Sequence, residues 1–171
     1  MSFRDHRLAG GIGADDRYWE ALEAGEFRLP RCAGCGRWTW PAHWRCGECG
    51  SWEFDWTALQ PRGSVYSWTR TWYAFDRTKE RAQDVPYVVV LAEIDGAGGA
   101  RAMGVLAGDD AGLKIGAPVA GTILPPSEKA KGYPSIVWSL ALHGRRSGGR
   151  PRWSASARRR STNGGAHPIR R

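Results

Sequence analysis

The chain has 171 residues, of which 42% are hydrophobic, enough for one compact domain with a small module and a tail. Its net charge of +8 suggests a nucleic-acid-binding protein, but residues 145–171 alone hold nine arginines and no acid. Residues 1–144 therefore carry 16 basic and 17 acidic side chains, which argues against a basic globular face. No stretch approaches the ~18 apolar residues of a membrane span, and the N-terminus lacks the apolar segment of a signal peptide. We expect a cytoplasmic protein with no membrane partner.

The first predicted element is a short helix within residues 14–28. It follows residues 1–13, which are polar and glycine-rich and which we expect to be flexible. Asp15 or Asp16 can cap the helix, and Gly25 can end it.

One side of this helix is aromatic, because Tyr18, Trp19 and Leu22 fall together at helical spacing. Two interpretations stay open. The face packs on its own domain, or it docks a partner, since the helix precedes a separate module instead of lying inside a larger core.

All four cysteines lie in that module, residues 29–57, in two copies of the pattern C-x-x-C-G. They are Cys32, Cys35, Cys46 and Cys49. Two thiolates three residues apart can reach one ion if the backbone turns tightly, and the following glycine allows the positive φ of such a turn. Two facing hairpins give four-sulfur tetrahedral coordination, the geometry of structural zinc or of thiolate-bound iron. The spacing predicts a rubredoxin-like zinc ribbon.

The alternative for these cysteines is a redox C-x-x-C or unpaired core cysteines, which two knuckles in matching register disfavour. His43 could replace a ligand, but four cysteines already complete the shell. The segment between the knuckles, residues 37–45, alternates like a strand, with Trp38 and Trp40 on one face. Because four thiolates leave no open position for water or substrate, we expect a structural metal.

A barrel is predicted for residues 58–143. The β-forming segments are residues 61–75, 86–95, 100–108, 113–124 and 134–142. Five short strands with Gly and Pro between them favour a small antiparallel barrel, of which the OB-fold is the common form. The predicted fold class is therefore mainly β: an N-terminal helix, a four-cysteine zinc ribbon and a five-stranded OB-fold barrel. Residues 144–171, rich in Arg, Ser and Gly, are predicted to be disordered.

The first barrel strand has an aromatic face, on which alternation places Tyr66, Trp68, Arg70 and Trp72. Such a face can stack nucleic-acid bases. It can equally stack the adenine of a nucleotide-containing cofactor, bury against a partner subunit, or fill the barrel itself.

The sequence offers no catalytic motif. It has no nucleophile elbow, no H-E-x-x-H and no P-loop. Nothing in it gives a positive reason to regard the chain alone as an enzyme.

The order of motifs is more specific than any one of them. An aromatic helix leads to "RLPRCAGCGRWTWPAHWRCGECGSWEFDW", then to "GSVYSWTRT", "PYVVVLAEID" and "LKIGAPV". Over about residues 16–142 this order resembles a family of zinc-ribbon plus OB-fold proteins, long catalogued as a domain of unknown function and associated with acyl-CoA metabolism. The basic tail departs from the family's usual pattern.

The resemblance implies a non-catalytic accessory subunit that scaffolds a thiolase or a lipid-transfer-protein-like aldolase. The four cysteines match the family's metal ligands one for one. The implied partners are the thiolase-like or aldolase subunit, a hydratase-like subunit, and acyl-CoA as a bound ligand. Tyr18, Trp19 and the aromatic residues of the first barrel strand would supply the contact surface.

Two other functions compete with this one. A nucleic-acid-binding module would use the aromatic face with the basic tail, although the near-neutral residues 1–144 count against it. A free acyl-CoA-binding protein would act with no partner.

Overall fold

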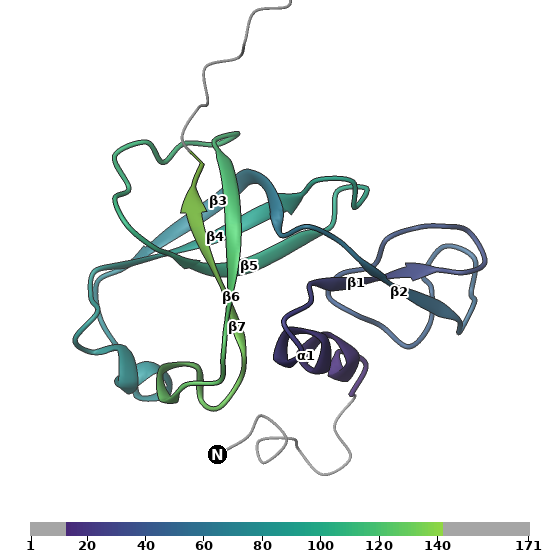
Figure 1. Cartoon of the computed structure of the whole chain (residues 1–171), viewed down its shortest axis with the longest axis horizontal. Helices are drawn as coiled ribbons and strands as arrows, with labels where there is room; N and C mark the ends of the chain where they lie inside the picture. Colours follow the sequence, from purple (N-terminus) through teal and green to yellow (C-terminus); the bar gives the residue numbers. More distant parts are fainter. Residues whose placement is uncertain (1–12, 142–171) are drawn as a thin grey trace, which may run out of the picture.

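The computed structural model describes residues 13–141. The expected disordered tail, residues 144–171, and all but the last residue of the expected flexible N-terminus lie outside the described residues. Two lobes are visible in Figure 1. One lobe holds helix α1 (Asp16–Glu23) and strands β1 (Arg28–Cys32) and β2 (Phe54–Ala58). The other is a closed five-stranded barrel, so the predicted mainly β class with one short helix is confirmed.

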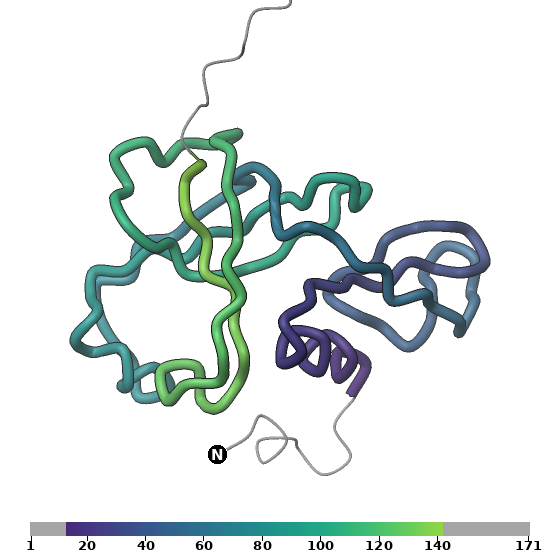
Figure 2. The backbone as a smooth tube through the Cα atoms, in the orientation of Figure 1, coloured from purple at the N-terminus to yellow at the C-terminus, as the bar shows by residue number. Residues whose placement is uncertain are grey.

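The barrel elements follow in chain order. They are β3 (Arg62–Thr71), the 3-10 helix η2 (Asp76–Arg81), β4 (Tyr87–Ile94), β5 (Arg101–Leu106), β6 (Pro118–Leu124), the 3-10 helix η3 (Glu128–Ala130) and β7 (Ser135–Leu140). Figure 2 shows the chain crossing from the ribbon lobe to the barrel through the segment after β2.

Helix α1 is shorter than the predicted range. Asp15 is its N-cap residue, but the carboxylate accepts a hydrogen bond from the Trp19 indole (2.9 Å) instead of capping a backbone N–H. Gly25 ends the helix as expected, because its φ of +79° turns the chain away and its N–H donates to the Leu22 carbonyl (3.0 Å).

The segment between the cysteine knuckles is not the predicted strand. It makes one isolated antiparallel bridge to β1, between Arg31 and Trp38. The bridge is formed by two backbone bonds, from Cys32 N–H to the Arg37 carbonyl (2.8 Å) and from Thr39 N–H to the Pro30 carbonyl (3.0 Å). Pro41 has no N–H to extend a ladder. The ribbon sheet is instead formed by β1 and β2, in an antiparallel register that pairs Cys32 with Phe54.

The barrel closes in the order β3-β4-β5-β7-β6. Because β7 pairs antiparallel with β6, it meets β5 in a short parallel pairing, which the prediction of a wholly antiparallel barrel missed. The closure depends on Gly104 of β5. A Cβ there would lie 2.3 Å from the Ile136 carbonyl oxygen, so a larger residue would push β7 away.

A bulge in β3 changes which side chains face the core. The register shifts between Val65 and Ser67, so Tyr66 has no partner on β4. Val65 is buried, and Trp68, three residues later, packs partly against the core. The prediction that Tyr66 and Trp68 lie on the same face of the strand is therefore wrong, because the extra residue of the bulge inverts the alternation of inward and outward side chains.

The core runs through both lobes. Tyr18, Leu22 and Leu29 of the ribbon lobe join one cluster with the barrel residues, of which Trp138 is fully buried. No helix within residues 13–141 is long and apolar enough to cross a membrane.

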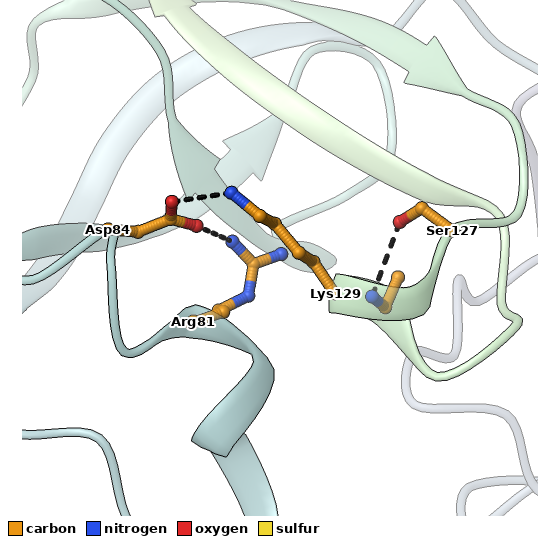
Figure 3. A network of polar contacts seen from close by, with 5 residues as sticks. Arg81, Asp84, Ser127 and Lys129 are labelled. Carbon is orange, nitrogen blue, oxygen red and sulfur yellow. Dashed lines mark hydrogen bonds and ion pairs between the residues drawn. The ribbon is translucent and has the colours of Figure 1, made fainter.

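Charged side chains join the two 3-10 helices beside the barrel (Figure 3). Asp84 accepts from Lys129 Nζ (2.5 Å) and pairs with Arg81 (3.5 Å). Glu80 pairs with Lys131 (3.0 Å), and the Ser127 hydroxyl caps η3 by accepting from the Ala130 N–H. These pairs link two loops that are distant in sequence.

We expect Asp84→Asn to loosen these loops without unfolding the barrel, because Arg81 and Lys129 would lose their shared carboxylate. Partly exposed pairs contribute about 0.2–1 kcal/mol each, so hydrogen exchange of residues 76–84 and 127–131 should accelerate severalfold while the melting temperature changes little. Glu93→Gln, which breaks the Arg101 pair elsewhere on the barrel, is the control. Unchanged exchange in Asp84→Asn would contradict the linkage.

Candidate metal centre and contact surfaces

The structure brings the four predicted cysteines to one point. Their sulfur atoms all lie within 4.8 Å of one another, with Cys32–Cys49 at 3.5 Å and Cys35–Cys46 at 3.7 Å. A tetrahedral ion with Zn–S bonds of about 2.3 Å holds its sulfurs about 3.8 Å apart. The four thiols fit zinc, and within residues 13–141 no other cluster of three or more potential ligands occurs.

Both knuckles use the same backbone bonds. The N–H of Gly36 donates to the Cys32 carbonyl (2.8 Å), and the N–H of Gly50 donates to the Cys46 carbonyl (3.0 Å). The two glycines have φ of +73° and +77°, the left-handed conformation for which glycine was predicted. Each turn thereby aims its two sulfurs at the same point.

The surroundings of the thiols favour a bound cation. The backbone N–H groups of Cys49 and Glu48 lower the pKa of the Cys46 thiol to about 6. Burial raises the pKa of Cys32, but N–H groups and the Cys49 thiol outweigh it, and the net shift is downward.

The Cys35 thiol behaves in the opposite way. The Arg37 N–H lowers its pKa, but burial and the other three cysteines raise it to about 12. Four thiols this close cannot all ionise unless a cation lies among them, because the thiolates repel one another. A bound metal ion supplies that cation.

An arginine and a tryptophan, which were not predicted as parts of the metal centre, extend each knuckle to R-C-x-x-C-G-x-W. Arg31 Nε donates to the Gly36 carbonyl (2.9 Å), and its guanidinium lies 5.8 Å from the Trp38 ring. In the second knuckle Arg45 donates to Gly50 (3.0 Å) and lies 5.8 Å from the ring of Trp52. The sequence shows this repeat when the residues that flank the two C-x-x-C-G patterns are aligned with each other.

The predicted aromatic face of α1 packs on its own domain. Tyr18 is 4% exposed, and its ring lies 4.1 Å from the Trp40 ring. Burial raises its pKa strongly. Trp19 is half-buried, and its ring meets Tyr133 of the barrel lobe at 4.8 Å. Tyr18 is therefore removed from the predicted contact surface, because its contacts within the chain already cover it.

The predicted residues of β3 do not form one patch. Tyr66 is exposed, with the Arg101 guanidinium 3.4 Å from its ring centroid. Arg70 pairs with Asp110 and lies 5.9 Å from the Trp72 ring. These arginines cover part of the aromatic surface that base stacking would need.

A more exposed group, which we call the aromatic loop, comprises residues 72–75; of its aromatic side chains only Trp72 was predicted to lie on the contact surface. Trp72, Tyr73 and Phe75 are 70%, 68% and 65% exposed, and the rings of Tyr73 and Phe75 meet edge to face at 5.3 Å. The run "WYAF" directly after a strand was the available signal. Large aromatic side chains clustered in solvent are typical of an interaction surface.

A groove of about 430 Å³ separates α1 from the barrel. Tyr18 and Trp19 line one side, Met103 and Ile136 line the other, and Arg81 adds a cation.

Two family models match successive parts of the chain. The rubredoxin-like zinc ribbon domain of ChsH2 matches residues 19–55, and the C-terminal OB-fold domain of ChsH2 matches residues 56–123, together more than half of the chain. No curated protein matches.

Solved structures with the same architecture exist. A chain of the Ltp2-ChsH2(DUF35) aldolase is 26% identical with a TM-score of 0.61, and the match covers 75% of this chain and 95% of that one. A protein of unknown function from the DUF35 family of Sulfolobus solfataricus is 18% identical with a TM-score of 0.52, covering 81% and 92%. The second likeness shows the fold alone.

Proposed function

Because the chain belongs to the ChsH2 family of zinc-ribbon and OB-fold proteins, we propose that it is a non-catalytic accessory subunit of a thiolase-superfamily enzyme acting on acyl-CoA. The observation that carries the proposal is the match across both lobes to a chain of the Ltp2-ChsH2(DUF35) aldolase, 95% of which is covered. The proposed partner is a thiolase or an aldolase of that superfamily, and a hydratase-like subunit is a further proposed partner. The assembly works in the cytoplasm, where the cysteines stay reduced.

The metal centre supports a structural role for this chain. Cys32, Cys35, Cys46 and Cys49 would hold zinc with four sulfurs, which leaves no position for water or substrate. The ion would supply folding energy to a ribbon that is too small to fold alone. Catalysis then belongs to the partner.

The aromatic loop is the part of the described surface best suited to meet the partner. Interface hot spots are enriched in tryptophan and tyrosine, and they lose water completely in the complex. Trp72 and Tyr73 are more than two-thirds exposed in the free chain, so a partner could bury a large apolar area there. The acyl-CoA would pass the groove between α1 and the barrel, with its apolar part against Trp19 and Met103.

Purification of the tagged chain from its native host at moderate salt should bring a thiolase-like subunit with it in stoichiometric amount. Trp72→Asp should weaken that association at least tenfold, because a hot-spot side chain contributes about 2 kcal/mol or more. The matched control is Ile115→Asp, a change at a side chain of similar exposure outside the aromatic loop.

Three outcomes would contradict the proposal. The tagged chain could purify alone, it could turn over acyl-CoA alone, or nucleic acid could accompany it until residues 145–171 are deleted. Equal loss of partner in Trp72→Asp and Ile115→Asp would remove the aromatic loop from the interface and leave the accessory function standing.

A further inference from the structure

We infer that Arg31 and Arg45 are positioning residues of the metal centre, and that Arg45 sets how fast the centre releases its metal. Each arginine directly precedes the first cysteine of its knuckle and bonds the carbonyl of the glycine after the second cysteine. The side chain therefore joins the two ends of the loop that presents the sulfurs. This role is independent of any partner subunit.

The two arginines close their loops in the same way. The guanidinium lies against the glycine: a Cβ on Gly36 would be 3.2 Å from Arg31 Nη2, and one on Gly50 would be 3.0 Å from Arg45 Nη2. The N–H of the first cysteine also donates across each loop, to the Arg37 carbonyl in the first knuckle and to the Ser51 carbonyl in the second (both 2.8 Å). With the Gly N–H to Cys carbonyl bond, each loop is therefore held by two backbone bonds and one charged side-chain hydrogen bond. Groups that orient metal ligands typically change metal affinity by about 10–100-fold when removed.

The two knuckles differ in what supports them from outside. Trp38, the aromatic partner of Arg31, packs partly on the core, and a Cβ on Gly98 of the β4–β5 turn would lie 2.9 Å from its ring. Cys32 belongs to strand β1 as well. The first knuckle therefore keeps its shape through the barrel and the sheet even without its arginine.

The second knuckle has less support. Trp52, the partner of Arg45, is 69% exposed, and a Cβ on Gly47 would meet no atom within 4 Å. Its links to the first knuckle include the surface ion pair of Glu48 with Arg37, and exposed pairs of this kind hold weakly. Opening of the centre should start here, with Cys46 and Cys49 leaving the ion first.

Charge adds to the effect of geometry. A divalent ion with four thiolates carries two net negative charges, and the two guanidinium groups are the cations that bond directly to the knuckle backbones. Lysine would keep the charge but lose the planar Nε–H donor and the stacking on tryptophan. Arg→Lys variants therefore separate positioning from charge.

The test measures zinc transfer from the full-length, zinc-loaded chain to an excess of a chelating dye. Arg45→Met should accelerate zinc release about 10–100-fold. The acceleration by Arg31→Met should be smaller than that by at least a factor of about three. Arg45→Lys should fail to restore the wild-type rate, whereas Trp52→Phe, which keeps an aromatic ring under the guanidinium, should stay within about threefold of it. Arg62→Met, an exposed arginine on the barrel, is the matched control.

Cobalt absorption provides a second readout. In the cobalt-loaded Arg45→Met chain the d–d bands should shift, because the Cys46 and Cys49 sulfurs are no longer held in place, while the far-UV circular dichroism stays unchanged. The inference would be overturned if Arg45→Met released zinc at the wild-type rate, or if the two Met variants accelerated release equally. A wild-type rate of zinc release in Arg45→Lys would overturn it as well. If Arg45→Met fails to fold, the rates of Arg45→Lys and Trp52→Ala decide, and wild-type rates in both would overturn it.

Discussion

Replacing Cys32 with serine is expected to remove the metal and unfold the ribbon while leaving the barrel strands in place. Cys32 is 2% exposed, and its sulfur is one of four within 4.8 Å of each other, so the remaining three thiols cannot close the shell. Binding of structural zinc contributes about 10–16 kcal/mol in isolated zinc-finger peptides. Losing even part of that free energy should unfold the knuckles, since Trp44 and Trp52 beside the second knuckle are exposed and add little apolar packing to hold it.

Three measurements check this result. Bound zinc should fall from one equivalent to less than about a tenth, proteases should cut within residues 33–53, and the strand signal in circular dichroism should persist. His43→Ser is the control, because His43 lies outside the sulfur cluster and should keep the zinc. A metal-free Cys32→Ser chain with the wild-type's protease resistance would mean that the centre is not structural.

Trp138→Ala is expected to destabilise the barrel by about 3–5 kcal/mol, the usual cost of truncating a buried aromatic side chain. The Trp138 ring is fully buried and packs where β5, β6 and β7 meet: Cβ atoms on Gly104 and Gly121 would each lie 2.9 Å from it. Glycines on the two strands that flank β7 make the space that the indole fills. Its removal leaves a cavity that these strands cannot close.

Urea unfolding measured by fluorescence and by circular dichroism tests the size of the effect. Trp138→Phe should cost less than the alanine change, because it keeps part of the ring and removes an indole N–H that has no hydrogen-bond partner. Trp72→Ala, at a residue 70% exposed, should change stability by less than about 0.5 kcal/mol. Similar losses at Trp138 and Trp72 would contradict this account of the core.

The metal centre could be predicted from the sequence because its determinants are local. Each knuckle closes within six residues, from an arginine to a glycine with positive φ, and the second repeats the first fourteen residues later. The five barrel strands could also be found locally, since runs rich in β-branched residues between glycines and prolines indicate strands. The ribbon strands β1 and β2 were not predicted, because they pair segments more than twenty residues apart. The register between β3 and β4 could not be predicted in this way, because the alternation of residues in the sequence gives no sign of the bulge at Tyr66.

The contact surfaces were decided by the tertiary structure. Whether an aromatic ring is covered depends on residues far away in the chain: Trp40 covers Tyr18, Tyr133 meets Trp19, and no described ring outside the aromatic loop stacks on Trp72. Barrel closure at Gly104 likewise depends on a strand more than thirty residues later. The sequence by itself determined the metal ligands and the barrel strands, because those follow from short-range patterns, whereas the β1–β2 pairing of the ribbon joins distant segments. Burial is a sum over contacts between distant segments, and only the folded chain brings those segments together.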